Sequence, residues 1–188
     1  MWGSITGLLA EIEKCEEAGA TCAAIAMAYV CIDTMAFLSM PETKSTQTRG
    51  DFIDWVNRYL EGHEDQPYRY AGVDVYAARC ALLHAFGSEA QAHRSDTSVK
   101  LFGYHNGGRH SFDPEISPNL VILGTASFLN DVRHAVDSFI RGCETDAGLR
   151  AKVEARLPKV IQMFPFPRPY GSSAEGELPM SDEEDEQN

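Results

Sequence analysis

The feature that most constrains the fold is the apolar run from Ala18 to Met40, in which Asp33 is the only charged residue. A run of this length raises the question of a membrane-spanning helix. It is rich in Ala, Thr and Cys, however, and a carboxylate such as Asp33 is costly inside a lipid bilayer. We therefore expect no membrane partner and predict the central helix of a bundle, ended by Pro41.

Asp33 becomes a buried carboxylate in such a bundle, and a buried charge requires a partner. Arg79 is the natural candidate, because it lies in a second apolar stretch farther along the chain. An ion pair of this kind is structural in some proteins and belongs to an active site in others. The sequence leaves both interpretations open.

Hydrophobic spacing predicts further helices on both sides of this run. The pattern i, i+3, i+4, i+7, typical of a helix with one apolar face, is followed by Ile5, Leu8, Leu9 and Ile12. Other predicted helices cover residues 52–60, 74–89, 120–142 and 146–160. The predicted fold class is therefore all-α, a helical bundle of five to six helices.

One hairpin and one tail complete the predicted architecture. Asn106-Gly107 lies between two short β-prone runs, which indicates a β-hairpin inserted in the bundle at about 99–112. The end of the chain is Pro-rich and then acidic, a composition typical of a disordered tail. We predict one helical domain over 1–165, including the hairpin, and a disordered tail over 166–188.

The distribution of charge limits the kinds of partner. The net charge is −12, but seven acidic residues and no basic residue lie between Ser173 and Asn188, which leaves −5 for the rest of the chain. A mildly acidic body argues against a broad nucleic-acid-binding surface. It still allows a small, local RNA site.

Cysteine usage indicates a reducing compartment. The five cysteines include no Cys-x-x-Cys pair, and three of them lie in apolar helical stretches. We interpret them as reduced side chains and expect a cytoplasmic protein. The N-terminal stretch also lacks the basic start of a signal peptide.

The predicted helix from Asp74 to Glu89 holds the candidate site. Its only basic side chains are Arg79 and His84, which are surrounded by apolar or small residues. Five positions separate them by roughly 140° around the helix axis and roughly 7.5 Å along it. One neighbouring helix cannot satisfy both, so we expect a cleft or a subunit interface here.

The segment Arg79-Cys80-Ala81-Leu82-Leu83-His84 resembles the Arg, four residues, His signature of the HEPN superfamily. The resemblance implies an α-helical bundle that pairs as a homodimer through this helix, with both protomers contributing to one cleft. It also implies a metal-independent endoribonuclease of a toxin–antitoxin or other defence system. A cognate antitoxin or another protein would then be a partner besides RNA.

The same resemblance implies roles for the two side chains. Arg79 would stabilise charge on the phosphate, and His84 would act as general acid or base. Asp33, Tyr76 and Arg69 are second candidates for positions in the cleft. No cofactor is expected for this chemistry.

A second candidate surface lies in the predicted hairpin. Lys100, Tyr104 and Arg109 combine positive charge with an aromatic ring, as single-stranded RNA sites do. The other interpretation is an ordinary polar hairpin turn. His105 and His110 flank this turn, but the sequence has no His-Glu-x-x-His or calcium-loop motif, and we expect no metal site.

Other functional classes lack their motifs. The sequence contains no Gly-rich phosphate-binding loop after a strand and no Gly-x-Ser-x-Gly elbow. The remaining alternatives to the endoribonuclease are a catalytically inactive HEPN-like binding or partner module, in which Arg79 and His84 are structural, and a sensor that binds a small ligand or nucleotide in the cleft.

Overall fold

The computed structural model describes residues 2–161 of the chain. These residues are mostly helical, which confirms the predicted all-helical character in its main part. The predicted boundary at residue 165 and the predicted tail over 166–188 lie outside the described residues.

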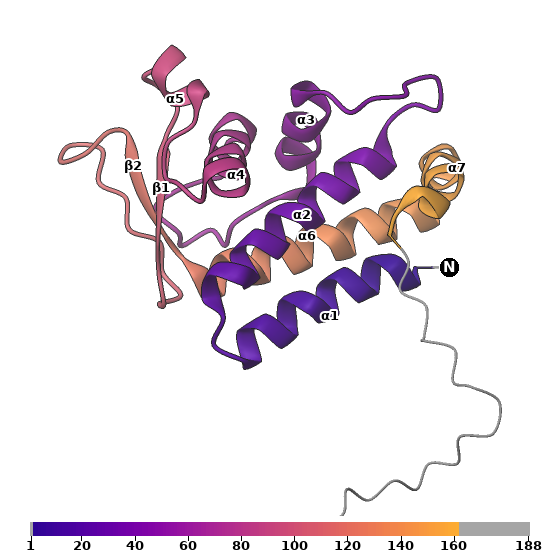
Figure 1. Cartoon of the computed structure of the whole chain (residues 1–188), viewed down its shortest axis with the longest axis horizontal. Helices are drawn as coiled ribbons and strands as arrows, with labels where there is room; N and C mark the ends of the chain where they lie inside the picture. The colour runs from indigo at the N-terminus through magenta and orange to yellow at the C-terminus, as the bar shows by residue number, and fades with distance from the viewer. Residues whose placement is uncertain (1, 162–188) are drawn as a thin grey trace, which may run out of the picture.

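Seven α-helices, two strands and a short 3-10 helix follow one another in the described part (Figure 1). They are α1 (Gly3–Glu17), α2 (Thr21–Ser39), α3 (Arg49–Tyr59), α4 (Gly72–Ala85), α5 (Gln91–Ser95), β1 (Leu101–His105), β2 (Leu120–Gly124), α6 (Thr125–Thr145), α7 (Ala147–Arg156) and η1 (Leu157–Lys159). The helix not predicted from the sequence is α5, whose five residues are too few to show a periodic pattern.

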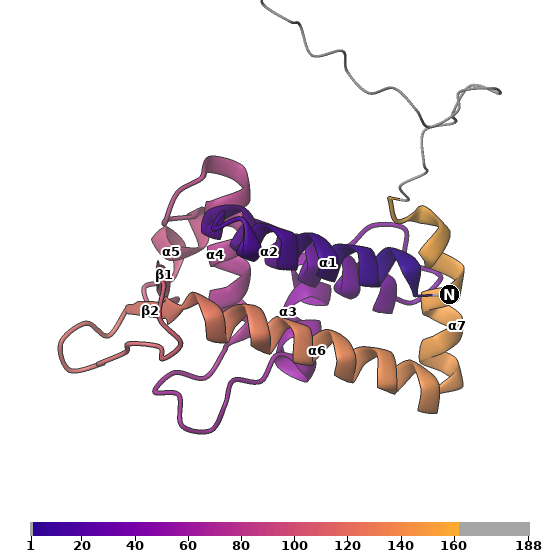
Figure 2. The ribbon, with the colours of Figure 1, turned by 90° about the horizontal axis from the view of Figure 1, so that it is seen from below.

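The apolar run forms α2, and the other helices are arranged around it. α2 contacts α1, α3, α4, α6 and α7. Figures 1 and 2 show α1 lying beside it and α6 running from the strands to α7. Ile25, Ile32 and Met35 are among its fully or almost fully buried side chains. Burying apolar side chains on several faces is what an apolar helix with a single charge requires.

Among the described helices, α2 is the one that is long and apolar enough to cross a membrane by length and composition. A core helix passes the same test. In this structure α2 packs against five other helices, which is the arrangement of a core helix.

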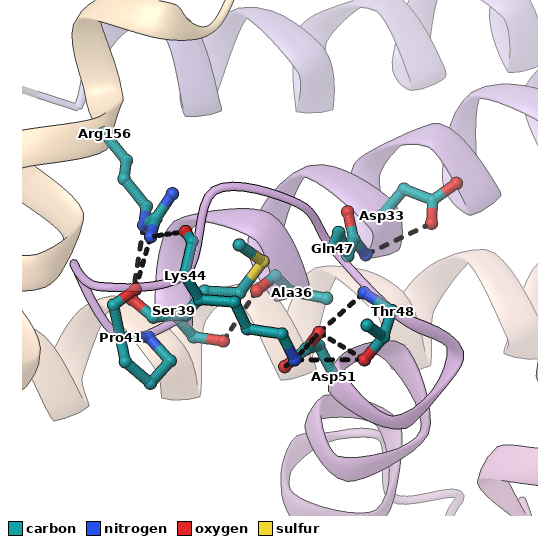
Figure 3. Close-up of polar contacts among 10 residues, drawn as sticks. Asp33, Ala36, Ser39, Pro41, Lys44, Gln47, Thr48, Asp51 and Arg156 are labelled. Carbon is teal, nitrogen blue, oxygen red and sulfur yellow. Dashed lines mark hydrogen bonds and ion pairs between the residues drawn. The ribbon is translucent and has the colours of Figure 1, made fainter.

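Arg156 holds the connection between α2 and α3 in place. Its guanidinium is buried and donates hydrogen bonds to the carbonyl oxygens of Met40 (3.2 Å), Pro41 and Lys44 (2.6 Å) (Figure 3). These carbonyls follow the C-terminal end of α2, where a positive charge is favourable. One side chain of α7 therefore satisfies the backbone of a turn that has no regular structure of its own.

The predicted hairpin at 99–112 is wrong. β1 pairs with β2 in parallel, with Leu101 opposite Leu120 and His105 opposite Gly124. The chain does turn near Asn106-Gly107, but the returning segment touches β2, through an antiparallel bridge between Ser111 and Ile122.

The preference for β2 has a physical reason. Residues 120–124 read LVILG, a short apolar run with two β-branched residues, and Val121 and Leu123 are completely buried. Such a run fits a buried strand better than the polar segment after the turn does. The prediction of one helix over 120–142 was therefore wrong over 120–124, because short apolar runs do not distinguish helix from strand by period.

Gly124 lets the turn approach the end of β2. A Cβ atom at this position would lie 2.5 Å from the carbonyl oxygen of Gly108. The close backbone contact therefore requires glycine.

A chain of hydrogen bonds joins the turn, β2 and α6. The Gly124 N–H donates to His110 Nδ1 (3.1 Å), and the Tyr70 hydroxyl donates to Asp131 Oδ2 (2.8 Å). Because His110 Nδ1 accepts the bond from Gly124, the proton of the neutral ring is on Nε2. His110 Nε2 therefore donates a hydrogen bond to Tyr70 Oη, at 2.8 Å. Burial, with a smaller effect of His105, lowers the pKa of His110 to about 4.

The first prediction concerns Arg156. Arg156→Lys should lower the free energy of unfolding by roughly 2–4 kcal/mol, because an ammonium group cannot reach the three carbonyls that the guanidinium satisfies. Arg150→Lys on the same helix replaces an exposed partner of Glu154 and should change it by less than about 1 kcal/mol. Urea unfolding measures both. Equal losses in the two variants would contradict the role given to Arg156.

The second prediction concerns pH. The pKa of His110 is depressed on folding, so its contribution is complete above the unfolded pKa of about 6.5 and is lost as pH falls toward 4. The loss is roughly 3 kcal/mol, at about 1.4 kcal/mol per pKa unit. His110→Gln should lower stability at pH 7.5 but flatten this dependence. A variant with the wild-type slope between pH 7.5 and 4.5 would refute the assignment.

Candidate functional site

The start of α4 is fixed to the rest of the fold by a buried carboxylate. Asp74 accepts hydrogen bonds from the Tyr68 hydroxyl (2.7 Å) and from the backbone N–H of Lys100 (2.8 Å). A carboxylate in the first turn of a helix is also favoured by the helix dipole. α4 is therefore tied both to the preceding loop and to the start of β1, and its C-terminal end points away from these anchors.

Arg79 forms the predicted ion pair with Asp33. The distance between Arg79 Nε and Asp33 Oδ2 is 2.6 Å, and about a fifth of each side chain is exposed (22% and 21%). Gln47 Nε2 lies 3.5 Å from the other carboxylate oxygen, at Asp33 Oδ1 (Figure 3). The charge of α2 is thus paired across the interface with α4.

Burial and pairing act in opposite directions on this ion pair. Burial raises the pKa of Asp33, and the hydrogen bond from Arg79 opposes that rise. Burial also disfavours the charge on Arg79, but Asp33 more than compensates and raises the pKa of Arg79. A guanidinium stays protonated in proteins, so Arg79 is a permanent donor at this position.

Arg79 also contacts His84 directly. Arg79 Nη1 lies 3.2 Å from His84 Nε2. A guanidinium can only donate, so His84 Nε2 accepts, and the proton of the neutral imidazole is on Nδ1. The angular separation of the two positions on the helix did not predict this contact, because the long arginine side chain spans a turn of the helix.

His84 lines a cavity of about 590 Å³. Five residues of α4 line it: Tyr76, Cys80, Ala81, His84 and Ala85. The other walls come from the start of α3 and from the segment that contains α5. Asp33 lines a different groove, of about 1050 Å³, beside α1. The contacts from Asp33 to Arg79 and from Arg79 to His84 therefore connect a residue that lines the groove beside α1 with a residue that lines the smaller cavity.

Tyr76 lies in the cavity as the sequence suggested for a cleft residue. Its ring packs edge-on against Phe52, and the guanidinium Cζ of Arg49 is 5.5 Å from the ring centroid. Burial raises the pKa of Tyr76, and hydrogen bonding with Cys80 adds to this rise. Three of the sequence candidates, Arg79, His84 and Tyr76, are thus close together on one helix.

Arg69 is placed elsewhere. Its guanidinium donates to the carbonyl oxygens of Gly62 (2.9 Å) and Glu64 (3.1 Å), in the loop that precedes α4. It is not among the residues that line the cavity. In this structure it holds its own loop together.

Lys100, Tyr104 and Arg109 are not gathered into one face. Lys100 Nζ lies 5.9 Å from the centroid of the Phe112 ring, and Tyr104 Oη is 2.6 Å from Tyr29 Oη in the interior. Arg109 is exposed, and its carbonyl accepts from His105 Nε2 (2.8 Å). None of the three lines the cavity next to His84.

Arg49 was not recognised from the sequence. It lies in a polar stretch, PETKSTQTRG, where nothing distinguishes it from its neighbours.

Phe86 was missed as well. It has a left-handed backbone (φ 48°), the only one among the described residues other than glycine, and its side chain is 72% exposed. An exposed aromatic residue in a conformation that favours glycine is a signal that only the structure gives.

No group of three or more His, Cys, Asp or Glu side chains comes together as a metal site within residues 2–161. The five cysteines all lie within these residues and form no disulfide bond there. The donors at the candidate site are a guanidinium, an imidazole and a hydroxyl, which suit an anion and proton transfer.

Comparison of the chain with protein-family models, curated proteins and solved structures finds no match.

Proposed function

We propose that the protein is a HEPN-like, metal-independent endoribonuclease whose site is formed by Arg79 and His84. The observation that supports this most is the contact of 3.2 Å between Arg79 Nη1 and His84 Nε2. The contact joins a group able to bind an anion to a group able to transfer a proton, and His84 also lines a cavity.

The proposed reaction is transesterification of RNA. His84 Nε2 takes the proton of a ribose 2′-hydroxyl, whose oxygen attacks the adjacent phosphorus. The bond from phosphorus to the 5′-oxygen breaks, and that oxygen is protonated as it leaves. The products are a 2′,3′-cyclic phosphate and a 5′-hydroxyl. Arg79 offers N–H groups to the phosphate oxygens as negative charge develops on them.

Asp33 is a positioning residue in this proposal. It holds Arg79 at Nε, which directs Nη1 toward His84. Arg79 Nη2 makes no hydrogen bond within the described residues, and is therefore available to a phosphate oxygen. A phosphate that draws Arg79 Nη1 to itself also releases the lone pair of His84 Nε2 for proton transfer.

The assembly belongs to the same proposal. A homodimer through α4 would bring two such sites to one cleft, and the exposed Phe86 and half-buried Leu82 and Leu83 at the end of α4 offer apolar surface for it. RNA, and a cognate antitoxin or another protein, are the proposed partners of a cytoplasmic protein in a toxin–antitoxin or defence system.

A second candidate function is supported by the ion pair itself. Arg79 already has a carboxylate and an imidazole as partners, so it can serve the fold alone. The protein would then be a catalytically inactive HEPN-like binding or partner module.

The third prediction separates these two functions. Mixed-sequence, end-labelled RNA incubated in EDTA with the wild-type protein should give fragments with 2′,3′-cyclic phosphate ends. His84→Ala and Arg79→Ala should each lower the rate by about 100-fold or more, because they remove proton transfer and charge stabilisation.

Matched controls are available on α6. His134→Ala and Arg141→Ala remove exposed side chains of the same types and should retain the wild-type rate. If a folded wild-type protein leaves the RNA intact, the endoribonuclease is excluded and the binding module takes its place. If His84→Ala cleaves as fast as wild type, His84 is excluded as the catalytic residue.

A further inference from the structure

The cavity beside His84 is an open pocket with the volume of a small-molecule site. It measures about 590 Å³ and lies between the start of α3, the outer face of α4 and the α5 segment. Ligand sites of this kind span roughly 300–1,000 Å³. The space suits one nucleotide, and is too small for a duplex.

Arg49 and Tyr76 supply the chemistry that a nucleotide needs. Arg49 Cζ lies 5.5 Å from the centroid of the Tyr76 ring, and both residues line the cavity. Within residues 2–161 Arg49 has no carboxylate at ion-pair distance and attracts Asp96 only at longer range, so its N–H groups remain for a ligand. A guanidinium beside an aromatic ring is a combination that holds a phosphate and a base together.

Hydrogen bonds at the start of α3 set the backbone position of Arg49. Thr48 N–H and its hydroxyl both donate to Asp51 Oδ2, at 2.6 and 2.7 Å, and Lys44 Nζ lies 2.6 Å from the same oxygen (Figure 3). These bonds cap α3 and fix the backbone from which Arg49 extends. The guanidinium that would bind the ligand therefore belongs to the first residue of a capped helix, α3.

The cavity also contains carboxylates, and these favour a nucleotide over a bare anion. Glu89 lies 3.7 Å from Arg94, and Asp96 accepts two hydrogen bonds from Ser98 (2.6 and 2.9 Å). Their remaining lone pairs can accept from ribose hydroxyls or base amino groups. A ligand with one phosphate and several donors matches this mixed lining.

We propose that this cavity binds one nucleotide of the RNA substrate, with Arg49 contacting its phosphate and Tyr76 lying against its base. The inference rests on the proposed function, because His84 lines the same cavity and would act on the ribose of the bound nucleotide. Arg49 is then a binding residue and His84 a catalytic one.

The fourth prediction tests this site by binding. The four nucleoside 5′-monophosphates, and inorganic phosphate alone, are titrated into the full chain by calorimetry. At least one nucleotide should bind more tightly than phosphate, and Arg49→Ala should weaken it by about tenfold or more. Arg58→Ala is the matched control. Arg58 lies on the same helix over the Tyr59 ring at 5.2 Å, outside the cavity, and its loss should leave the affinity unchanged.

Cleavage kinetics separate this inference from the proposed function. Arg49→Ala should raise the KM for RNA and leave kcat nearly unchanged, as expected for a residue that only binds. Active wild-type enzyme with the same KM in Arg49→Ala would overturn the nucleotide site and keep the endoribonuclease. Arg49-dependent nucleotide binding without RNA cleavage would support the site and remove the endoribonuclease. Equal nucleotide affinity in wild type and Arg49→Ala would overturn the inference.

Discussion

The ion pair between Asp33 and Arg79 is the interaction on which the arrangement of the site depends. α2 is the helix around which the bundle packs, and Asp33 is its only charged residue. A carboxylate that is largely removed from water needs a partner, and Arg79 reaches it at 2.6 Å. The pair therefore sets how α4 lies against α2, and with it the position of the C-terminal end of α4.

His84, the proposed general acid or base, lies at that end. The Asp74 carboxylate anchors the start of α4 to β1 and to the preceding loop, so the helix is held at one end and along its middle. Its last turn places His84 in the lining of the cavity, together with Tyr76 and Arg49, and Arg79 contacts His84 from outside that lining. A site on a fixed helix with an open end combines precise geometry with access for a ligand.

The sequence predicted the parts of the fold that burial dictates. An apolar run with one carboxylate required a central helix and a cationic partner, and both α2 and the Asp33–Arg79 pair follow from that requirement. The parallel pairing of β1 with β2 could not be predicted in the same way. Asn106-Gly107 does lie in a turn, but the choice of strand partner depended on the buried β2 run, 13 or more positions farther along the chain. Nonlocal pairing of this kind leaves no local pattern.

The candidate site was predictable in its main residues only. The contact between Arg79 and His84 depends on side-chain reach, which a helical wheel does not represent. Arg49 comes close to Tyr76 only through the packing of α3 on α4.

The role given to the ion pair between Asp33 and Arg79 is tested most directly by a double-mutant cycle of Asp33→Ala and Arg79→Ala on the free energy of unfolding. We expect a coupling energy of at least about 1 kcal/mol, as found for contacting charged residues. Additivity within about 0.3 kcal/mol would contradict it, because the two side chains would then not stabilise one another.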